Sequence, residues 1–246
     1  NIIIKNAYRL SVSQTRAQVF YGFSQSQKWD LGGELVRTAR RFDDHARSSP
    51  FKVFNSDDLN KKGFSLMGLR LRTAPFSELP ELSMQAGIRF PIANGDDRRR
   101  ELGAQRTQLN LNVNYFKDFS RANAYFLTAG WGIHLPYTPD GGGLKQHAIH
   151  ALSLGAFLSI NVINQRLYLI PGISFSANFQ KSGSSGQFNN LTQSMFAEAV
   201  IQYQITSNFN LIFQQSLPVL FESYLPQVEF ERRSFSATTI GARMFF

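Results

Sequence analysis

Apolar and polar residues alternate along most of this chain in segments of roughly ten residues. In the clearest segment, residues 108–115, apolar side chains occupy every second position, and Gln or Asn occupies the positions between them. Successive side chains of a β-strand point to opposite faces, so this pattern predicts a strand with one apolar and one polar face. Comparable segments recur at residues 8–12, 17–23, 29–35, 67–71, 82–90, 109–115, 125–135, 152–160, 167–179, 195–205, 209–213 and 240–246.

The length of these segments fits a membrane-spanning strand. A tilted strand crosses a bilayer with about 9–11 residues, whereas a helix needs about 18 or more apolar residues in a row, and no such run is present. Soluble sandwiches also alternate, but they rarely keep so many strands of this length. We therefore predict an all-β protein: a transmembrane antiparallel up-and-down β-barrel that forms a single domain over residues 1–246.

The connections between the predicted strands alternate between short and long. Short turns on one side and long loops on the other are typical of transmembrane barrels, and five short turns imply about twelve strands. The first pair of strands is ambiguous, because the apolar phase changes between Val12 and Ala17. We expect a tight turn near residues 13–15, with a bulge in one long strand as the alternative.

The composition indicates a large amount of apolar surface. The 246 residues include 23 Phe, 8 Tyr and 2 Trp, although the mean hydropathy is slightly negative at -0.22. Alternating strands hide their lipid-facing half from any window average, so this value does not argue against a barrel. The absence of cysteine excludes disulfides and thiolate metal sites. The chain begins at Asn1, and we expect a mature or shortened product.

The last residues alternate and end in an aromatic side chain, with Ala242, Met244 and Phe246 on one face. Here the chain resembles bacterial outer-membrane β-barrels as a class, whose last strand usually ends in Phe. The resemblance implies a location in the bacterial outer membrane and recognition of Phe246 by the barrel assembly machinery. In size, and in the strand pattern that begins at Leu82, the chain also resembles the small transporter-like MetA-type barrels of phenol degradation.

Catalytic chemistry finds little support in the sequence. The length is similar to that of the outer-membrane phospholipase, but the His-x-Ser-Asn-Gly motif of that family is absent. His134, His147 and His150 could meet at a loop as a metal or base site, but no carboxylate lies near them in the sequence to orient them. We therefore expect no enzyme activity, no cofactor and no metal site.

Charged residues occupy polar positions inside the predicted strands. A bare Arg or Lys that faces lipid costs about 2–4 kcal/mol at the bilayer midplane, so the alternation places these charges in the lumen. The arginines would then favour anions, with Glu34 and Glu198 as counter-charges. Alternatively, arginine–carboxylate pairs fill a barrel too narrow to conduct. The predicted lumen residues are Asp30, Glu34, Arg70, Arg72, Arg89, Glu198 and Arg243.

These alternatives correspond to two functions. The first is a channel or transporter for small solutes that favours anions. The second is a non-conducting structural or docking subunit of a larger outer-membrane complex, such as one for secretion or for surface proteins. A continuous open lumen would distinguish the first function from the second.

Basic residues also gather in the predicted loops, and Arg98, Arg99 and Arg100 form the densest run. They could contact lipopolysaccharide phosphates, or they could be solvated charges balanced by nearby carboxylates. The formal net charge of +9 does not indicate nucleic-acid binding, because the sequence contains no recognised motif and no continuous basic stripe. The expected partners are outer-membrane lipid, lipopolysaccharide, the barrel assembly machinery and other envelope proteins.

Overall fold

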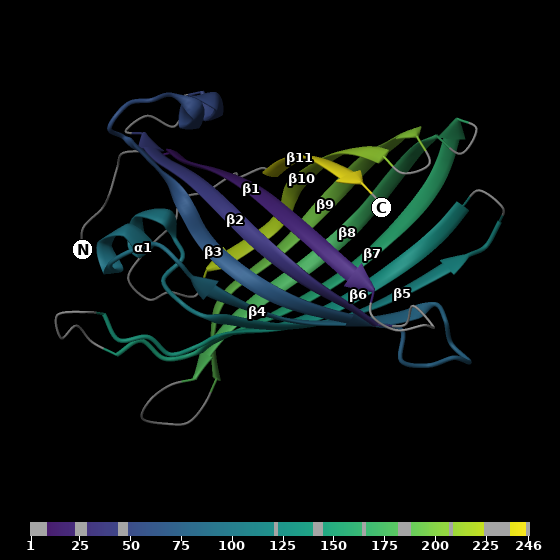
Figure 1. The fold of residues 1–246 in the computed structure, drawn as a ribbon, viewed down its shortest axis with the longest axis horizontal. Helices are drawn as coiled ribbons and strands as arrows, with labels where there is room; N and C mark the ends of the chain where they lie inside the picture. Colours follow the sequence, from purple (N-terminus) through teal and green to yellow (C-terminus); the bar gives the residue numbers. More distant parts are fainter. Residues whose placement is uncertain are drawn as a thin grey trace. The chain divides into compact units, whose positions relative to one another are not determined.

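A computed structural model describes residues 9–22, 29–43, 49–120, 123–139, 145–163, 166–181, 188–206, 209–223 and 237–244. Within these residues, eleven strands form one hydrogen-bonded sheet in sequence order (Figure 1). The predicted all-β, antiparallel, up-and-down class is therefore confirmed. The strands are β1 (Arg9–Gly22), β2 (Trp29–Asp43), β3 (Asn60–Thr73), β4 (Leu82–Pro91), β5 (Gln108–Asp118), β6 (Asn123–His134), β7 (Ile149–Ile163), β8 (Leu167–Lys181), β9 (Phe188–Thr206), β10 (Phe209–Ser223) and β11 (Ala237–Met244).

Two short helices lie in the long connections, and the alternation pattern did not predict either of them. The 3-10 helix η1 (Pro50–Phe54) begins after Ser49, whose Oγ accepts a hydrogen bond of 3.3 Å from the backbone N–H of Phe51. The α-helix α1 (Asp96–Leu102) ends at Gly103, which adopts the left-handed conformation with φ 68°. Glycine fits this position because other residues pay a steric penalty there. In the described part of the chain, no helix is long and apolar enough to cross a membrane.

The first strand differs from the sequence prediction. The turn expected near residues 13–15 is wrong, because β1 is continuous and pairs with β2 along its whole length without a register shift. The alternative bulge is absent for the same reason. Ladder hydrogen bonds join backbone atoms, so the change of apolar phase between Val12 and Ala17 does not interrupt the pairing. The described residues consequently contain eleven strands, where about twelve were expected.

The loops also depart from a strict alternation of lengths. Residues 44–59, 92–107 and 135–148 form long connections as predicted, but only residues 182–187 separate β8 from β9. Both strands extend into polar sequence there, because their side chains pair across the ladder. Ser176 Oγ lies 2.7 Å from Ser194 Oγ. Asn178 Nδ2 donates to Thr192 Oγ1 at 2.8 Å.

Residue contacts divide the chain into two compact units. The first unit comprises Asn1–Arg72, Ala86–Leu109 and Leu135–Gln146. The second comprises Thr73–Gln85, Asn110–His134 and His147–Phe246.

In the first unit, residues 29–35 of β2 place Asp30 and Glu34 on one face and Trp29, Leu31 and Leu35 on the other. Glu34 and Thr38 are buried on the first face, which we call the polar face, whereas Leu31 and Leu35 are exposed on the second. The residues of β1 share these faces through the register, so Ala17 lies opposite Leu35. This division agrees with the alternation predicted for residues 29–35.

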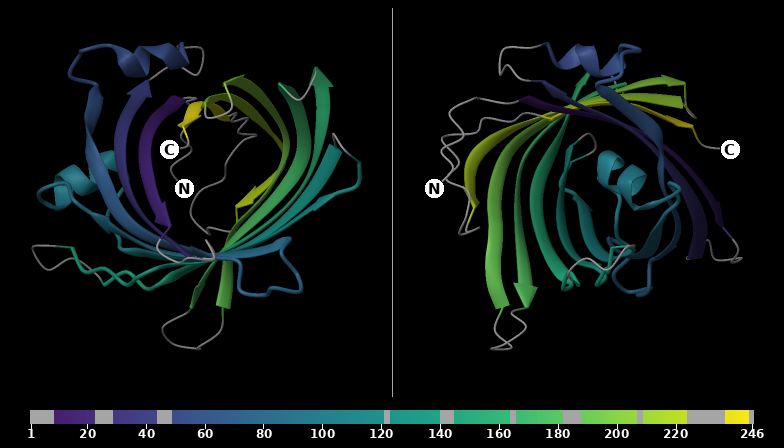
Figure 2. Two further views of the ribbon diagram at one scale, coloured as in Figure 1. Left: turned by 45° about the vertical axis from the view of Figure 1, so that its right-hand side comes forward. Right: turned by 90° about the vertical axis from the view of Figure 1, so that its left-hand side faces the viewer.

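In the second unit, the apolar side chains line up across neighbouring strands, which lie side by side (Figure 2). The register joins Ala129, Leu154, Phe175 and Met195 of β6–β9 in one such row. Many apolar side chains in these rows are exposed, including Leu154 at 47%. A continuous exposed apolar face of this kind suits lipid rather than water.

Candidate functional site

The centre of the candidate site is Glu34, on the polar face of β2. Its side chain is completely buried, with a relative exposure of 0%. A charged carboxylate is seldom buried unless cations and hydrogen bonds compensate the loss of water. The neighbouring strands supply such groups.

Three arginines surround this carboxylate. Arg70 Nη2 lies 2.7 Å from Glu34 Oε2, Arg89 Nε donates to Glu34 Oε1, and Arg16 Nε lies 3.7 Å from Oε2. Gln18 Nε2 adds a neutral hydrogen bond of 2.9 Å to Oε2. The site therefore draws side chains from β1, β2, β3 and β4. We call Arg16, Arg70, Arg89 and Glu34 the arginine cluster.

The small residue Gly68 makes room for this arrangement. A Cβ atom at Gly68 would lie 2.7 Å from the carbonyl oxygen of Ile88 and 3.0 Å from Cγ of Arg89. It would also lie 3.2 Å from Cγ of Glu34. A larger residue at position 68 would therefore displace the strand or the two charged side chains. Gly68 thus provides space for its bulky neighbours Arg89 and Glu34.

A second ion pair lies on the same face. Arg72 Nη2 is 2.7 Å from Asp30 Oδ2, and the guanidinium carbon of Arg72 is 3.8 Å from the centroid of the Phe20 ring. That ring covers Gly32, where an added Cβ would collide with it. A guanidinium over an aromatic face gains cation–π attraction, so Phe20 helps to hold Arg72 in place.

The arginine cluster is electrostatically unbalanced. Among the described residues, three guanidiniums face one carboxylate, which leaves two positive charges in excess, whereas Arg72 and Asp30 balance each other. The three arginines differ in exposure: Arg70 and Arg89 side chains are 11% and 17% exposed, and that of Arg16 is 43% exposed. Arg16 is also the most distant from the carboxylate among the ion pairs of the cluster. It is therefore the member best placed to meet an anion in solution.

The structure brings together Asp30, Glu34, Arg70, Arg72 and Arg89 from the predicted lumen set. It does not give Glu198 the predicted role of counter-charge to an arginine. Ser174 Oγ donates to Glu198 Oε1, and Gln214 Nε2 donates to Oε2 at 2.6 Å. No ion pair involves Glu198 within the part of the chain that the structure describes. These donors are neutral. They reach the carboxylate because β8 and β10 pair with β9 on its two sides.

Two further predicted residues lie at or beyond the limits of the description. The backbone of Arg243, in β11, pairs with that of Asn210 in β10, but the side chain of Arg243 lies outside the described residues. Phe246, the predicted assembly signal, also lies outside them.

The loop arginines lie on α1. Arg98 donates to the carbonyl oxygen of Lys62 and pairs with Glu101 at 2.9 Å. Arg99 Nε donates to the carbonyl oxygen of Ala93 at 2.9 Å. The Arg100 side chain is 63% exposed and lies 3.9 Å from Asp97. All three arginines thus contact groups of this chain, and their contact with lipopolysaccharide stays a prediction.

The sequence reasoning missed Arg16, Gln18 and Phe20. The turn expected at residues 13–15 concealed the continuity of β1, so the polar face of this strand was not considered. The signal was nevertheless present, because Arg16, Gln18 and Phe20 alternate with Ala17, Val19 and Tyr21. Once β1 is read as one strand, these residues fall on the face of Glu34.

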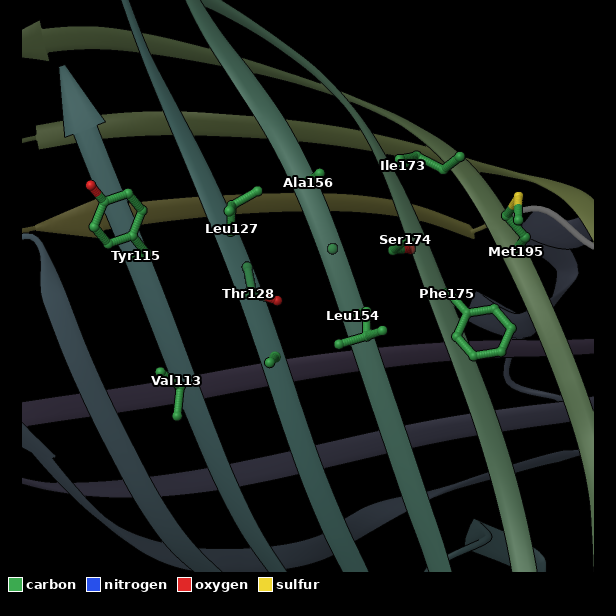
Figure 3. A pocket seen from close by; sticks show the side chains of 12 residues that line it. Val113, Tyr115, Leu127, Thr128, Leu154, Ala156, Ile173, Ser174, Phe175 and Met195 are labelled. Carbon is green, nitrogen blue, oxygen red and sulfur yellow. The ribbon is translucent and has the colours of Figure 1, made fainter. Parts of the chain in front are cut away.

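A depression on the apolar face of the second unit has a volume of about 500 Å³ (Figure 3). Apolar side chains such as Val113, Leu127, Leu154 and Ile173 line most of it. Tyr115 is the one titratable residue among those that line it.

The histidines do not form a metal centre in the described residues, where no group of three metal-ligating side chains occurs. The ring of His150 stacks on Trp131, with centroids 6.0 Å apart, and meets the edge of Phe188 at 5.2 Å. His150 therefore belongs to an aromatic group.

This antiparallel sheet in sequence order is similar in fold to solved structures of an outer-membrane channel and a porin. The COG4313 outer membrane channel from Pseudomonas putida F1 aligns with a TM-score of 0.60 over 97% of this chain and 85% of its own, at 12% sequence identity. The NanC porin aligns with a TM-score of 0.53 over 97% of this chain and 98% of its own, at 10% identity. No protein-family model and no curated protein matches the sequence. At these identities, the likeness concerns the fold.

Proposed function

We propose that this protein is a channel of the bacterial outer membrane that passes small solutes and favours anions. The fold that it shares with an outer-membrane porin and an outer-membrane channel supports the location and the general activity. The anion preference rests on a single observation, the excess of guanidiniums over carboxylates around Glu34. On this proposal, the apolar face contacts lipid and the polar face lines the lumen.

The charge excess acts on solutes through the field that it creates. Arginine remains protonated at all physiological pH values, so the excess is permanent. Fixed positive charge beside a narrow aqueous path attracts anions and repels cations. Glu34 holds Arg70 and Arg89 in place, and the more exposed Arg16 contacts the passing anion.

A non-conducting structural or docking barrel is the second candidate. The observation in its favour is that aromatic rings occupy the space over glycines on the polar face. Phe20 covers Gly32, and Phe157 covers Gly172 while stacking on Phe126 at 4.6 Å. Large residues over glycines fill the interior of narrow barrels. A protein of this kind would act through other envelope proteins.

Planar-bilayer recording tests the two candidates. The refolded protein is inserted at low density, and single-channel current is measured in symmetric and then asymmetric KCl. Steady current steps support the anion channel if the reversal potential shifts toward the equilibrium potential of chloride. Cation preference contradicts the role given to the arginine cluster. Silence from protein with the far-UV circular dichroism of a folded barrel favours the structural candidate.

The partners are proposals as well. The phosphates of lipopolysaccharide are anionic, and exposed cations near a lipid-facing surface would attract them. Arg37, on the apolar face of β2, is an exposed cation of the first unit. Phe51 beside Lys52 is 73% exposed and would enter the lipid. Recognition of Phe246 by the barrel assembly machinery completes the proposed set of partners.

A further inference from the structure

The segment that contains α1 folds onto the polar face of the first unit, beside the arginine cluster. Its residues Leu102 and Ala104 are both 2% exposed, and Ala104 packs with Val36 and Leu66 in a buried apolar cluster. Val36 follows Glu34 by two residues on the same face, a distance of about 7 Å along the strand. The segment therefore covers the polar face directly next to the arginine cluster.

Polar contacts fix the segment at both ends of the helix. Arg40, on the polar face of β2, donates from Nη1 to the carbonyl oxygens of Arg100 and Glu101 at 3.1 and 3.3 Å. These are carbonyls at the C-terminal end of α1, where partial negative charge favours a cation. Near the other end, Arg98 donates to the carbonyl oxygen of Lys62 in β3.

The sheet is shaped to receive the helix. Gly63 of β3 lies under Leu102, and a Cβ atom at Gly63 would be 3.3 Å from Cδ1 of that leucine. Lys61 Nζ reaches Glu101 Oε1 at 3.6 Å from the same strand (Figure 1 shows α1 against β2 and β3). A segment with a buried apolar contact, anchored at both ends, holds one position on the sheet.

We infer that residues 93–107, with α1 at their centre, form the constriction that sets the size limit of the channel. This inference rests on the proposed function, because a size limit needs a conducting lumen. The helix itself carries three acidic and three basic residues, so it occupies space without adding net charge. The charge preference and the size limit therefore come from different residues, the arginine cluster for the first and α1 for the second.

Thiol labelling in the lumen tests the inference. The chain has no cysteine, so Asp97→Cys introduces a unique thiol on α1 at a side chain that is 96% exposed. A bulky methanethiosulfonate reagent added to the recorded channel should then cause a stepwise, irreversible loss of a large part of the conductance. The matched control is Lys52→Cys, an exposed site on η1, a helix that packs against the apolar face of β1 and β2 through Val53. Labelling there should leave the conductance unchanged.

A second variant measures the size limit itself. Replacing Asp96–Leu102 with three glycines should increase the conductance and admit larger polyethylene glycols in a polymer-exclusion assay. The reversal potential in a KCl gradient should stay the same, because the removed helix is neutral. If the shortened protein does not fold, the labelling experiment still decides the question.

The outcomes separate this inference from the proposed function. Wild-type conduction together with unchanged current after complete labelling of Asp97→Cys overturns the inference alone. An equal loss of current in the Lys52→Cys control overturns it as well, since the effect is then not specific to α1. No conduction by any variant, including the wild type, overturns the proposed function.

Discussion

Arg70 Nη2 lies 2.7 Å from Oε2 of Glu34, although 36 residues separate the two along the chain. The contact joins β2 to β3 on the polar face, and Arg89 makes a similar contact from β4. Because the carboxylate is completely buried, its partners determine whether the three strands can keep this packing. The first prediction follows from that dependence.

Glu34→Gln should destabilise the protein by about 3–5 kcal/mol, the usual cost of removing one partner from a buried ion pair. The glutamine keeps the shape but leaves three guanidiniums without a carboxylate. Urea titration in detergent micelles, followed by the fluorescence of Trp29 and Trp131, measures the change. Glu78→Gln, at an exposed position between β3 and β4, should change the unfolding free energy very little. Equal effects in the two variants would contradict the role of Glu34.

Arg16→Gln should reduce the anion preference and leave stability nearly unchanged. The Arg16 side chain is 43% exposed, and its contact with Glu34 is 3.7 Å, so the pair contributes at most about 1 kcal/mol. The reversal potential in a KCl gradient should move toward zero. Lys52→Gln removes an equal charge on η1 and should leave the reversal potential where it was. An equal shift of the reversal potential in Lys52→Gln would show that the anion preference depends on the overall charge and not on the position of Arg16.

Gly32→Ala should cost about 1–3 kcal/mol, because the new methyl group must displace the ring of Phe20. The adjacent substitution Gly33→Ala offers a matched control, since nothing lies within 4 Å of a Cβ atom at Gly33. Unfolding midpoints of the two variants give the comparison. The double variant Gly32→Ala with Phe20→Leu should recover part of the loss. No difference between positions 32 and 33 would contradict the packing described for Phe20.

Leu154→Arg and Ser153→Arg place the same cation on opposite faces of β7. Arginine at position 154 would face lipid. It should destabilise the folded protein by about 2–4 kcal/mol if it lies near the bilayer midplane. Arginine at position 153 would lie on the polar face, where water can solvate it. The free energies of unfolding of the two variants, measured in phospholipid vesicles, give the comparison. A larger loss for Ser153→Arg would reverse the assignment of the faces.

Low pH should weaken the ion pairs of Glu101 that help to hold α1 on the sheet. The hydrogen bond from Arg98 lowers the pKa of Glu101 below its ordinary value of 4.5, and Lys61 acts in the same direction. Because the folded-state pKa is the lower one, the stabilisation is complete above pH 4.5 and is lost as the pH falls through the lowered pKa. The protection factors for hydrogen exchange of residues 96–104, which correct for the intrinsic pH dependence of exchange, should therefore fall below pH 4.5. Glu101→Gln should remove this pH dependence, and an unchanged acid response in that variant would contradict the assignment.

The alternation of residues predicted the strands and their faces because one face of each strand is apolar and the other polar. The same reasoning placed Glu34, Arg70 and Arg89 on one face. It could not predict that they touch, since parity along a strand does not fix its position relative to the next strand. The helix α1 was also missed, because its seven residues are mainly charged and show no apolar period. Tertiary contacts through Leu102 and Arg40 hold it in place.

The unbroken register between β1 and β2 restricts how the gene for this protein can change in length. Inserting one codon within β2, between those for Leu31 and Glu34, would exchange the faces of every following residue of the strand. Glu34 would then point into lipid, away from its three arginines. Insertions and deletions that persist in related genes should therefore lie in the connections, or occur within strands as pairs of codons.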